Sequence, residues 1–305
     1  MNSISELSTF RDMVRWGTSQ FNAANLHFGH GYTNAWDEAL CLVRHVLHLS
    51  PDEDKHVADA RLLLSEREQI AALFQRRIQE HKPAAYLTHE AWFAGLSFYV
   101  DERVIIPRSP IAELIQQQFS PWLSEEPENI LDMCTGSGCI AIASALNFPD
   151  ATIDAVDISK DALDVARRNV QQHQLESRVN LIQSDLFTSI PPKKYSLIIC
   201  NPPYVDAKEM AALPQEYQHE PTLALAGGAD GLDLVQKILD QAADYLTPEG
   251  ILIVEVGASA PAAETRFANY PLTWLEFEHG GSGVFLMRKD KIKKFQRKDA
   301  KTQRR

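Results

Sequence analysis

From Asn129 onward, short apolar runs alternate with stretches of helical periodicity, and this alternation constrains the fold more than any other feature. Apolar runs bounded by turn residues predict buried strands, and the periodic stretches between them are long enough to be crossover helices. The sequence therefore predicts an α/β fold with a mostly parallel, doubly wound sheet. The expected strands cover 130–133, 152–157, 179–183, 197–200, 251–256 and 284–287, the expected helices lie near 138–147, 160–173 and 232–246, and 273–277 is expected to pair antiparallel with the last strand.

The chain before this region has a different pattern. Apolar residues such as Leu40, Val43 and Leu47 recur at helical spacing without strand-like alternation. Lys82-Pro83 interrupts the helical pattern, and alternating aromatic residues and a glycine then indicate a hairpin. We expect a helical domain over 1–84, a β-hairpin linker over 85–106, a larger domain over 107–288 and a basic, disordered tail over 289–305.

Charge is distributed unevenly along the chain. Ten basic and two acidic residues lie between Arg288 and Arg305, whereas the remainder has 20 basic and 39 acidic residues. An acidic body argues against a large DNA-binding surface. The basic tail fits two interpretations that stay open, attraction to ribosomal RNA and a solvated segment without a partner.

The sequence gives no sign of export or membrane insertion. No apolar run approaches the roughly 20 residues of a membrane span, and the N-terminus lacks the basic and apolar regions of a secretory signal. Cys41, Cys134, Cys139 and Cys200 form no C-x-x-C pair, so we expect free thiols in a reducing cytoplasm. We expect neither a membrane nor a metal among the partners.

Asn201-Pro202-Pro203-Tyr204 directly follows the expected strand 197–200. Both prolines have fixed φ angles and no N–H donor. The Asn201 side-chain oxygen and the Pro202 backbone oxygen are therefore neighbouring acceptors that suit a planar NH₂ group. Taken alone, this stretch is equally consistent with a turn after a core strand.

A second polar cluster follows the strand 130–133. Cys134-Thr135-Gly136-Ser137-Gly138 links that strand to a helix start, where glycines allow close backbone approach to a ligand. Gly136, Gly138 and Ala141 match the G-x-G-x-x-A form of a dinucleotide fingerprint, and Asp157 closes the next strand as an acceptor for ribose hydroxyls. These residues fit NAD as well as S-adenosylmethionine.

Asp185-Leu186 ends the third strand, so polar side chains end successive strands before the Asn-Pro-Pro-Tyr stretch. This layout resembles that of class I S-adenosylmethionine-dependent methyltransferases. The resemblance implies a Rossmann-like, mostly parallel seven-stranded sheet with an antiparallel last strand, and S-adenosylmethionine as cofactor. It assigns to the cofactor site Asp132, Cys134, Thr135, Gly136, Ser137 and Gly138 beside the amino-acid moiety, Asp157 at the ribose, Asp185 and Leu186 at the adenine, and Asn201.

The Asn-Pro-Pro-Tyr stretch looks like the motif of methyltransferases that act on planar nitrogens. An amide nitrogen is a poor nucleophile because its lone pair is delocalised. Acceptors at Asn201 and Pro202 would stabilise charge that develops on this nitrogen, and Tyr204 would wall the pocket. We therefore expect Asn201, Pro202 and Tyr204 to be catalytic and, together with Pro203, to bind the substrate.

Further motifs resemble those of the protein-glutamine methyltransferases. Residues 220–232 read EPTLALAGGADGL, similar to E-P-x-x-A-L-x-G-G-x-D-G-L, and the resemblance runs from about residue 35 to 288. Pro107-Arg108-Ser109-Pro110 departs from the P-R-P-E-T-E of the release-factor branch and looks like the branch that modifies large-subunit ribosomal protein three. Gly29-His30-Gly31 also resembles the latter branch. The implied reaction is methylation of a glutamine of that protein in support of ribosome assembly, with substrate recognition by the helical domain and catalysis by the larger one.

Four alternatives remain. The nearest is the same chemistry on the GGQ glutamine of peptide-chain release factors. Adenine amino methylation of nucleic acid shares the motif but predicts a basic recognition region. A binding module that has lost activity conflicts with the intact Asp157, Asp185 and Asn201, and an NAD-dependent dehydrogenase leaves the Asn-Pro-Pro-Tyr stretch without a role.

Overall fold

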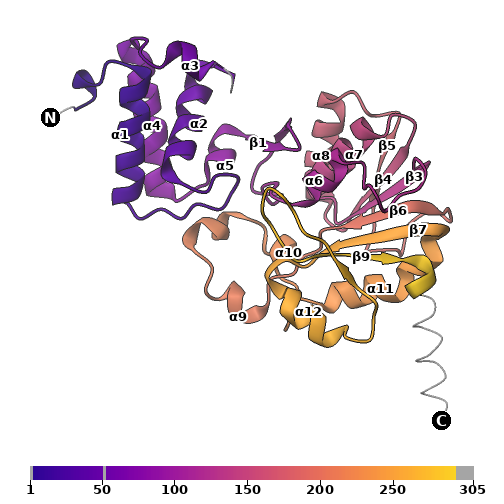
Figure 1. Cartoon of the computed structure of the whole chain (residues 1–305). Coiled ribbons are helices and arrows are strands. Elements are labelled where there is room, and N and C mark those ends of the chain that lie inside the picture. Colours follow the sequence, from indigo (N-terminus) through magenta and orange to yellow (C-terminus); the bar gives the residue numbers. More distant parts are fainter. Residues whose placement is uncertain (1–2, 51–52, 293–305) are drawn as a thin grey trace. The chain divides into compact units, whose positions relative to one another are not determined.

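The computed structural model describes residues 3–50 and 53–292, which divide into two units by their contacts (Figure 1). The first unit comprises the chain up to Ala91 together with Pro214–His219, and the second comprises the remaining described residues. The boundary lies inside β1 (Glu90–Phe93), and the chain returns to the first unit for six residues within a loop of the second.

The first unit is helical, as the sequence predicts. Hydrogen bonds at the helix starts explain two of its boundaries: Thr9 and Asp12 form a reciprocal capping box, and Asn34 accepts from the backbone of Asp37. Gly17 lets the Phe74 ring approach, because a Cβ on Gly17 would lie 2.4 Å from it. The elements are η1 (Ser3–Glu6), α1 (Phe10–Ala23), α2 (Ala35–Leu47), α3 (Asp54–Val57), α4 (Leu64–Glu80), α5 (Ala84–Thr88) and the returning η2 (Gln215–His219).

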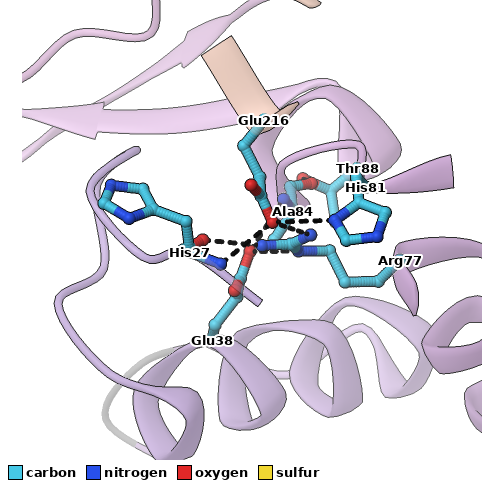
Figure 2. Close-up of polar contacts among 7 residues, drawn as sticks. All are labelled: His27, Glu38, Arg77, His81, Ala84, Thr88 and Glu216. Carbon is cyan, nitrogen blue, oxygen red and sulfur yellow. Dashed lines mark hydrogen bonds and ion pairs between the residues drawn. The ribbon is translucent and has the colours of Figure 1, made fainter. Parts of the chain in front are cut away.

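A buried polar network holds the returning segment in this unit (Figure 2). Arg77 donates to Glu38 Oε1 at 3.0 Å, to Glu216 Oε1 at 3.2 Å and to the His27 carbonyl at 3.0 Å. The backbone N–H of His27 also donates to Glu216, and His81 Nδ1 lies 3.3 Å from the same oxygen. The Arg77 side chain is 1% exposed, so a buried guanidinium joins two buried carboxylates.

A two-stranded hairpin of β1 and β2 (Leu96–Tyr99) follows, with Ala94 and Gly95 at φ of 51° and 80° in its turn. Two positive φ angles are typical of the tight turn that matches strand twist. The expectation of a hairpin linker from residue 85 is wrong for its first residues, which form α5. Pro83 precedes two alanines there, and proline before good helix formers favours a helix start.

The second unit has a seven-stranded sheet in the order β5-β4-β3-β6-β7-β9-β8. The first five of these strands are parallel, and β9 is antiparallel to β7 and β8. The predicted fold class is therefore confirmed, and the strand pattern had located all of its strands, although β8 is shorter than expected. The strands are β3 (Asn129–Met133), β4 (Thr152–Asp157), β5 (Val179–Gln183), β6 (Tyr195–Cys200), β7 (Leu246–Glu255), β8 (Thr273–Trp274) and β9 (Val284–Arg288).

Helices cover both faces of this sheet and create two hydrophobic cores (Figure 1). Along β6, Leu197 and Ile199 belong to one core, and Ile198 and Cys200 to the other. Burial on both faces explains why the parallel strands read as continuous apolar runs. The elements are α6 (Ile111–Gln116), α7 (Cys139–Asn147) and α8 (Lys160–Gln172), then α9 (Ala207–Met210), α10 (Thr222–Leu225), α11 (Asp233–Tyr245), η3 (Gly257–Ser259) and α12 (Ala260–Arg266).

The chain continues past β9 with helical backbone over 289–292, and Ile292 is buried in the second core. The expectation of disorder is therefore wrong for these four residues. The remainder of the predicted tail, 293–305, lies outside the described residues.

Candidate active site

A cleft of about 820 Å³, including its open mouth, lies at the carboxyl ends of the central parallel strands. This is the edge where ligands bind in open α/β sheets. Polar residues that end or follow four strands line it: Cys134 after β3, Asp157 on β4, Asp185 after β5 and Asn201 after β6. The other predicted residues that line it are Gly136, Leu186 and Pro203.

The loop between β3 and α7 folds over the side chain of Asp132. One oxygen of that carboxyl accepts from Thr135 Oγ at 2.5 Å and from the Ala141 N–H at 3.1 Å. Asp132 is fully buried, and burial raises its pKa to about 7. Its Oδ1 has no hydrogen-bond partner among the residues that the structure describes. Asp132 therefore lies beneath the loop and does not line the cleft.

Glycine is required at two points of this loop. Gly136 has a φ of 55°, and an added Cβ would meet no atom within 4 Å, so its backbone faces open space. Gly138 has a φ of 81°, and its Cβ position lies 3.3 Å from Ala166 on α8. Left-handed backbone explains the preference for glycine at both positions, and tight packing reinforces it at Gly138. Thr135, Ser137 and Gly138 shape the loop without lining the cleft.

Asp157 fixes the other side of the loop. Its carboxylate accepts from the Gly136 N–H at 2.9 Å and from the Ser159 N–H at 2.9 Å, where α8 begins. Burial raises the pKa of Asp157 despite these hydrogen bonds. Leu186, after β5, has the left-handed φ of 48°. These residues and the apolar Met133, Val156 and Ile158 make a cleft with acidic and apolar walls.

Hydrogen bonds from outside the Asn-Pro-Pro-Tyr stretch hold its last residue, Tyr204. Tyr204 donates from its hydroxyl to Glu255 Oε1 at 3.1 Å, and its carbonyl accepts from Ser259 Oγ at 2.7 Å. Glu255 Oε2 accepts from Ser109 Oγ at 2.5 Å. Asn201 and Pro203 line the cleft, whereas Pro202 is buried and Tyr204 is half-buried, and neither is among the lining residues.

Sequence reasoning missed several contributors to this site. Glu255 ends β7 as Asp157 ends β4, so the search for polar residues at strand ends could also have found Glu255. Arg108 donates to both oxygens of Glu220, at 2.5 and 2.8 Å, and the segment after Glu220 reaches the cleft. The unpredicted lining residues include Arg103, Val104, Ile105, Ser159, Pro221, Leu223 and Ala224.

The donor set fits an adenosyl cofactor that carries a positive charge. Carboxyls at the buried Asp132, the partly buried Asp157 and the exposed Asp185 favour a cation, and apolar walls suit a base. The open space above the Gly136 backbone leaves room for close approach. Within residues 3–50 and 53–292, no group of three His, Cys, Asp or Glu side chains gathers to hold a metal, and no helix is long and apolar enough to cross a membrane.

Comparison with known proteins identifies similar chains. The family model described as "Methyltransferase small domain" matches residues 113–217. Two curated relatives, from Bordetella pertussis and Neisseria gonorrhoeae, are each named "Ribosomal protein uL3 glutamine methyltransferase". Each is 50% identical, over 95% of this chain and 98% of the relative in the first case and 94% and 96% in the second. A methyltransferase structure from Pyrococcus furiosus is 18% identical with a TM-score of 0.47, covering 64% of this chain and 89% of its own.

Proposed function

The chain belongs to the family of ribosomal protein uL3 glutamine methyltransferases, and from this premise we propose that it methylates a glutamine side-chain amide of ribosomal protein uL3. This protein is the large-subunit ribosomal protein three that the sequence motifs indicate. One observation carries the proposal: Asn201, at the end of β6, lines the same cleft as Gly136, Asp157 and Asp185. A planar-nitrogen motif and a cofactor site thus share one cavity.

S-adenosylmethionine is the methyl donor, and when bound it supplies an electrophilic methyl group on a sulfonium. The chain's own residues hold it. Asp157 accepts from the Gly136 N–H, and its remaining lone pairs would accept from the ribose hydroxyls, while Asp185 and Leu186 would lie beside the adenine. The buried Asp132 supports the loop and places negative charge beneath a cationic ligand when it is ionised.

On the acceptor side, Asn201 Oδ1 and the Pro202 carbonyl accept the two N–H groups of the glutamine amide. These acceptors favour the positive charge that develops on nitrogen during methyl transfer. They also fix the nitrogen in line with the methyl group, and such orientation contributes about 7–11 kcal/mol. Tyr204 and Pro203 limit the pocket around the planar group, and the methylated amide then loses its proton to water.

The proposal extends to the setting of the reaction. The protein acts in the cytoplasm, where ribosomal proteins are made and assembled. The methylation of uL3 supports assembly of the large ribosomal subunit. The basic tail contacts ribosomal RNA through its positive charge. The helical first unit takes part in recognition of the protein substrate.

A labelling experiment tests the proposal. The full chain is incubated with methyl-labelled S-adenosylmethionine and, separately, with unmodified uL3 and an unmodified release factor, and the label is located by peptide mass. Label on a uL3 glutamine alone is expected. Label on the release-factor GGQ glutamine alone would show that the substrate is a release factor and not uL3. An absence of label on both proteins would reject glutamine methylation.

Asn201→Ala tests the role of Asn201 in the cleft. This variant is expected to bind S-adenosylmethionine and to lose at least about 100-fold in kcat, the loss typical of one removed charge-stabilising group. Asn180→Ala is a matched control, because Asn180 lies near the amino end of β5 and donates to Asp154. Methyl transfer by Asn201→Ala at the rate of this control would refute the assigned role.

A further inference from the structure

Tyr204 is fixed by groups that belong to neither the cofactor side of the cleft nor the Asn-Pro-Pro-Tyr stretch. Its hydroxyl meets Glu255 at the end of β7, the strand that pairs with β6. Its ring lies against the backbone of Gly257, since a Cβ there would come within 2.5 Å of the ring. Its carbonyl accepts from Ser259. The ring and the backbone of Tyr204 are thus held separately.

Glu255 is a rigid and deeply buried anchor. Glu255 is 4% exposed, and its backbone lies opposite Val284 in the antiparallel ladder of β7 and β9. A buried carboxylate needs hydrogen-bond donors to offset its desolvation. The two donors are hydroxyls, from Tyr204 at 3.1 Å and from Ser109 at 2.5 Å, one to each oxygen. Burial raises the pKa of Glu255, and these two hydroxyls oppose that rise.

Ser109 sets the orientation of this carboxylate. Its hydroxyl donates to Glu255 and accepts from the Ile111 N–H at 3.1 Å, at the start of α6. The hydroxyl hydrogen therefore points to the carboxylate, which is held at Oε2 by Ser109 and at Oε1 by Tyr204. Because Ser109 is 7% exposed, water does not readily replace this contact.

We propose that Ser109 and Glu255 form a relay of positioning residues that fixes the Tyr204 ring for methyl transfer. Ser109 orients the carboxylate, the carboxylate orients the phenol, and the ring then presents a fixed wall to the acceptor amide. This inference rests on the proposed function and adds two residues, far apart in sequence, to its acceptor side. It also gives Ser109 a physical role beyond marking the sequence branch.

The relay predicts that its members act as one unit. Ser109→Ala and Tyr204→Phe are each expected to lower kcat about tenfold, the loss expected for a hydrogen bond to a charged group. The double variant is expected to be no slower than the slower single variant, since Ser109 acts only through the Tyr204 hydroxyl. The affinity for S-adenosylmethionine should stay within about twofold because neither residue lines the cofactor cleft, and KM for uL3 should stay within about twofold because both variants keep the Tyr204 ring. Ser109→Thr should restore kcat because it keeps the hydroxyl.

Two controls separate positioning from stability. Ser144→Ala removes another buried serine hydroxyl, one without a hydrogen-bond partner in the described part of the chain. Tyr195→Phe removes a buried phenol that donates to Asp154 at 2.7 Å at the opposite end of β6. Both are expected to keep kcat, whatever their melting temperatures.

The kcat values of the single and double variants decide whether Ser109 acts through Tyr204. Losses of kcat that multiply to about 100-fold in the double variant would overturn the relay, as would a Ser109→Ala variant that melts earlier but keeps kcat. A wild-type protein that labels no uL3 glutamine would instead reject the proposed function. These two failures are therefore distinguishable in one set of assays.

Discussion

Arg77→Met should destabilise the first unit strongly, because it leaves two buried carboxylates without their cation. The Arg77 guanidinium makes three hydrogen bonds, and the side chains of Glu38 and Glu216 are 4% and 2% exposed. Removing one partner from a buried ion pair costs about 3–5 kcal/mol, since the remaining charge stays desolvated. Met keeps most of the apolar volume, so cavity formation adds little.

Hydrogen exchange followed by mass spectrometry measures this cost directly. Amides of α1, α2 and α4 that exchange through unfolding of this unit should lose about 150- to 5,000-fold in protection, at 1.36 kcal/mol per tenfold change. The matched control is Arg76→Met on the same helix, where the partly exposed pair with Glu80 contributes about 0.5 kcal/mol. Equal losses in the two variants would refute the claim that burial makes Arg77 indispensable.

The same network should respond to acid. Burial would raise the pKa of Glu216, but the His27 N–H and the Arg77 charge outweigh it and hold the pKa below its ordinary value. A lowered folded-state pKa means that the carboxylate's contribution is complete above its unfolded pKa and is lost as pH falls through the folded one. Glu216→Gln should remove this part of the acid destabilisation, measured by the same exchange experiment. An unchanged acid profile would contradict it.

Two further predictions concern the cofactor loop. Gly136→Ala places a Cβ at φ 55° over the open cleft. Its backbone strain should lower the folding stability by about 1–2 kcal/mol, and S-adenosylmethionine affinity by calorimetry should fall because the methyl group occupies the space of the ligand; unchanged affinity would contradict the loop's assigned contact. Asp132 has a raised folded-state pKa of about 7, so the free energy of unfolding should decline as pH rises from about 4 to 7, where the unfolded state binds fewer protons. Asp132→Asn should flatten that decline when stability is measured by urea unfolding. A pH dependence equal to that of the wild type would contradict the raised pKa of Asp132.

The sequence predicted the sheet well because its central strands are buried on both faces. β4 has the expected bounds, and β3 and β9 each differ by one residue at one end; the partly buried edge strand β5 also has the expected bounds. A strand covered by helices on both faces is mostly apolar, so its limits are visible as the limits of an apolar run. β7 begins at Leu246, earlier than its apolar run, because Leu246 pairs with Tyr195 beyond a register shift.

The sequence could not predict contacts that depend on how distant segments meet. Arg77 and Glu216 are separated by 139 residues, and Ser109 and Glu255 by 146. Neither pair lies at a spacing with a local meaning, whereas an N-cap or a glycine loop does. The returning segment Pro214–His219 likewise carries no signal that it joins the helical unit.

The two sides of the cleft were therefore predictable to different degrees for a structural reason. On the cofactor side, the carboxyls of Asp132 and Asp157 accept from groups in the loops that follow strand ends: Asp132 from the Thr135 hydroxyl and the Ala141 N–H, and Asp157 from the Ser159 N–H and the Gly136 N–H. Short-range geometry is encoded in residue order, so reading strand ends in sequence finds these groups. The acceptor side draws on β7, which follows β6 only after a long excursion but lies beside it in the sheet. Once the doubly wound order places those strands side by side, Glu255 falls at the same edge as Asn201, and strand-end reading applied in sheet order would have found it.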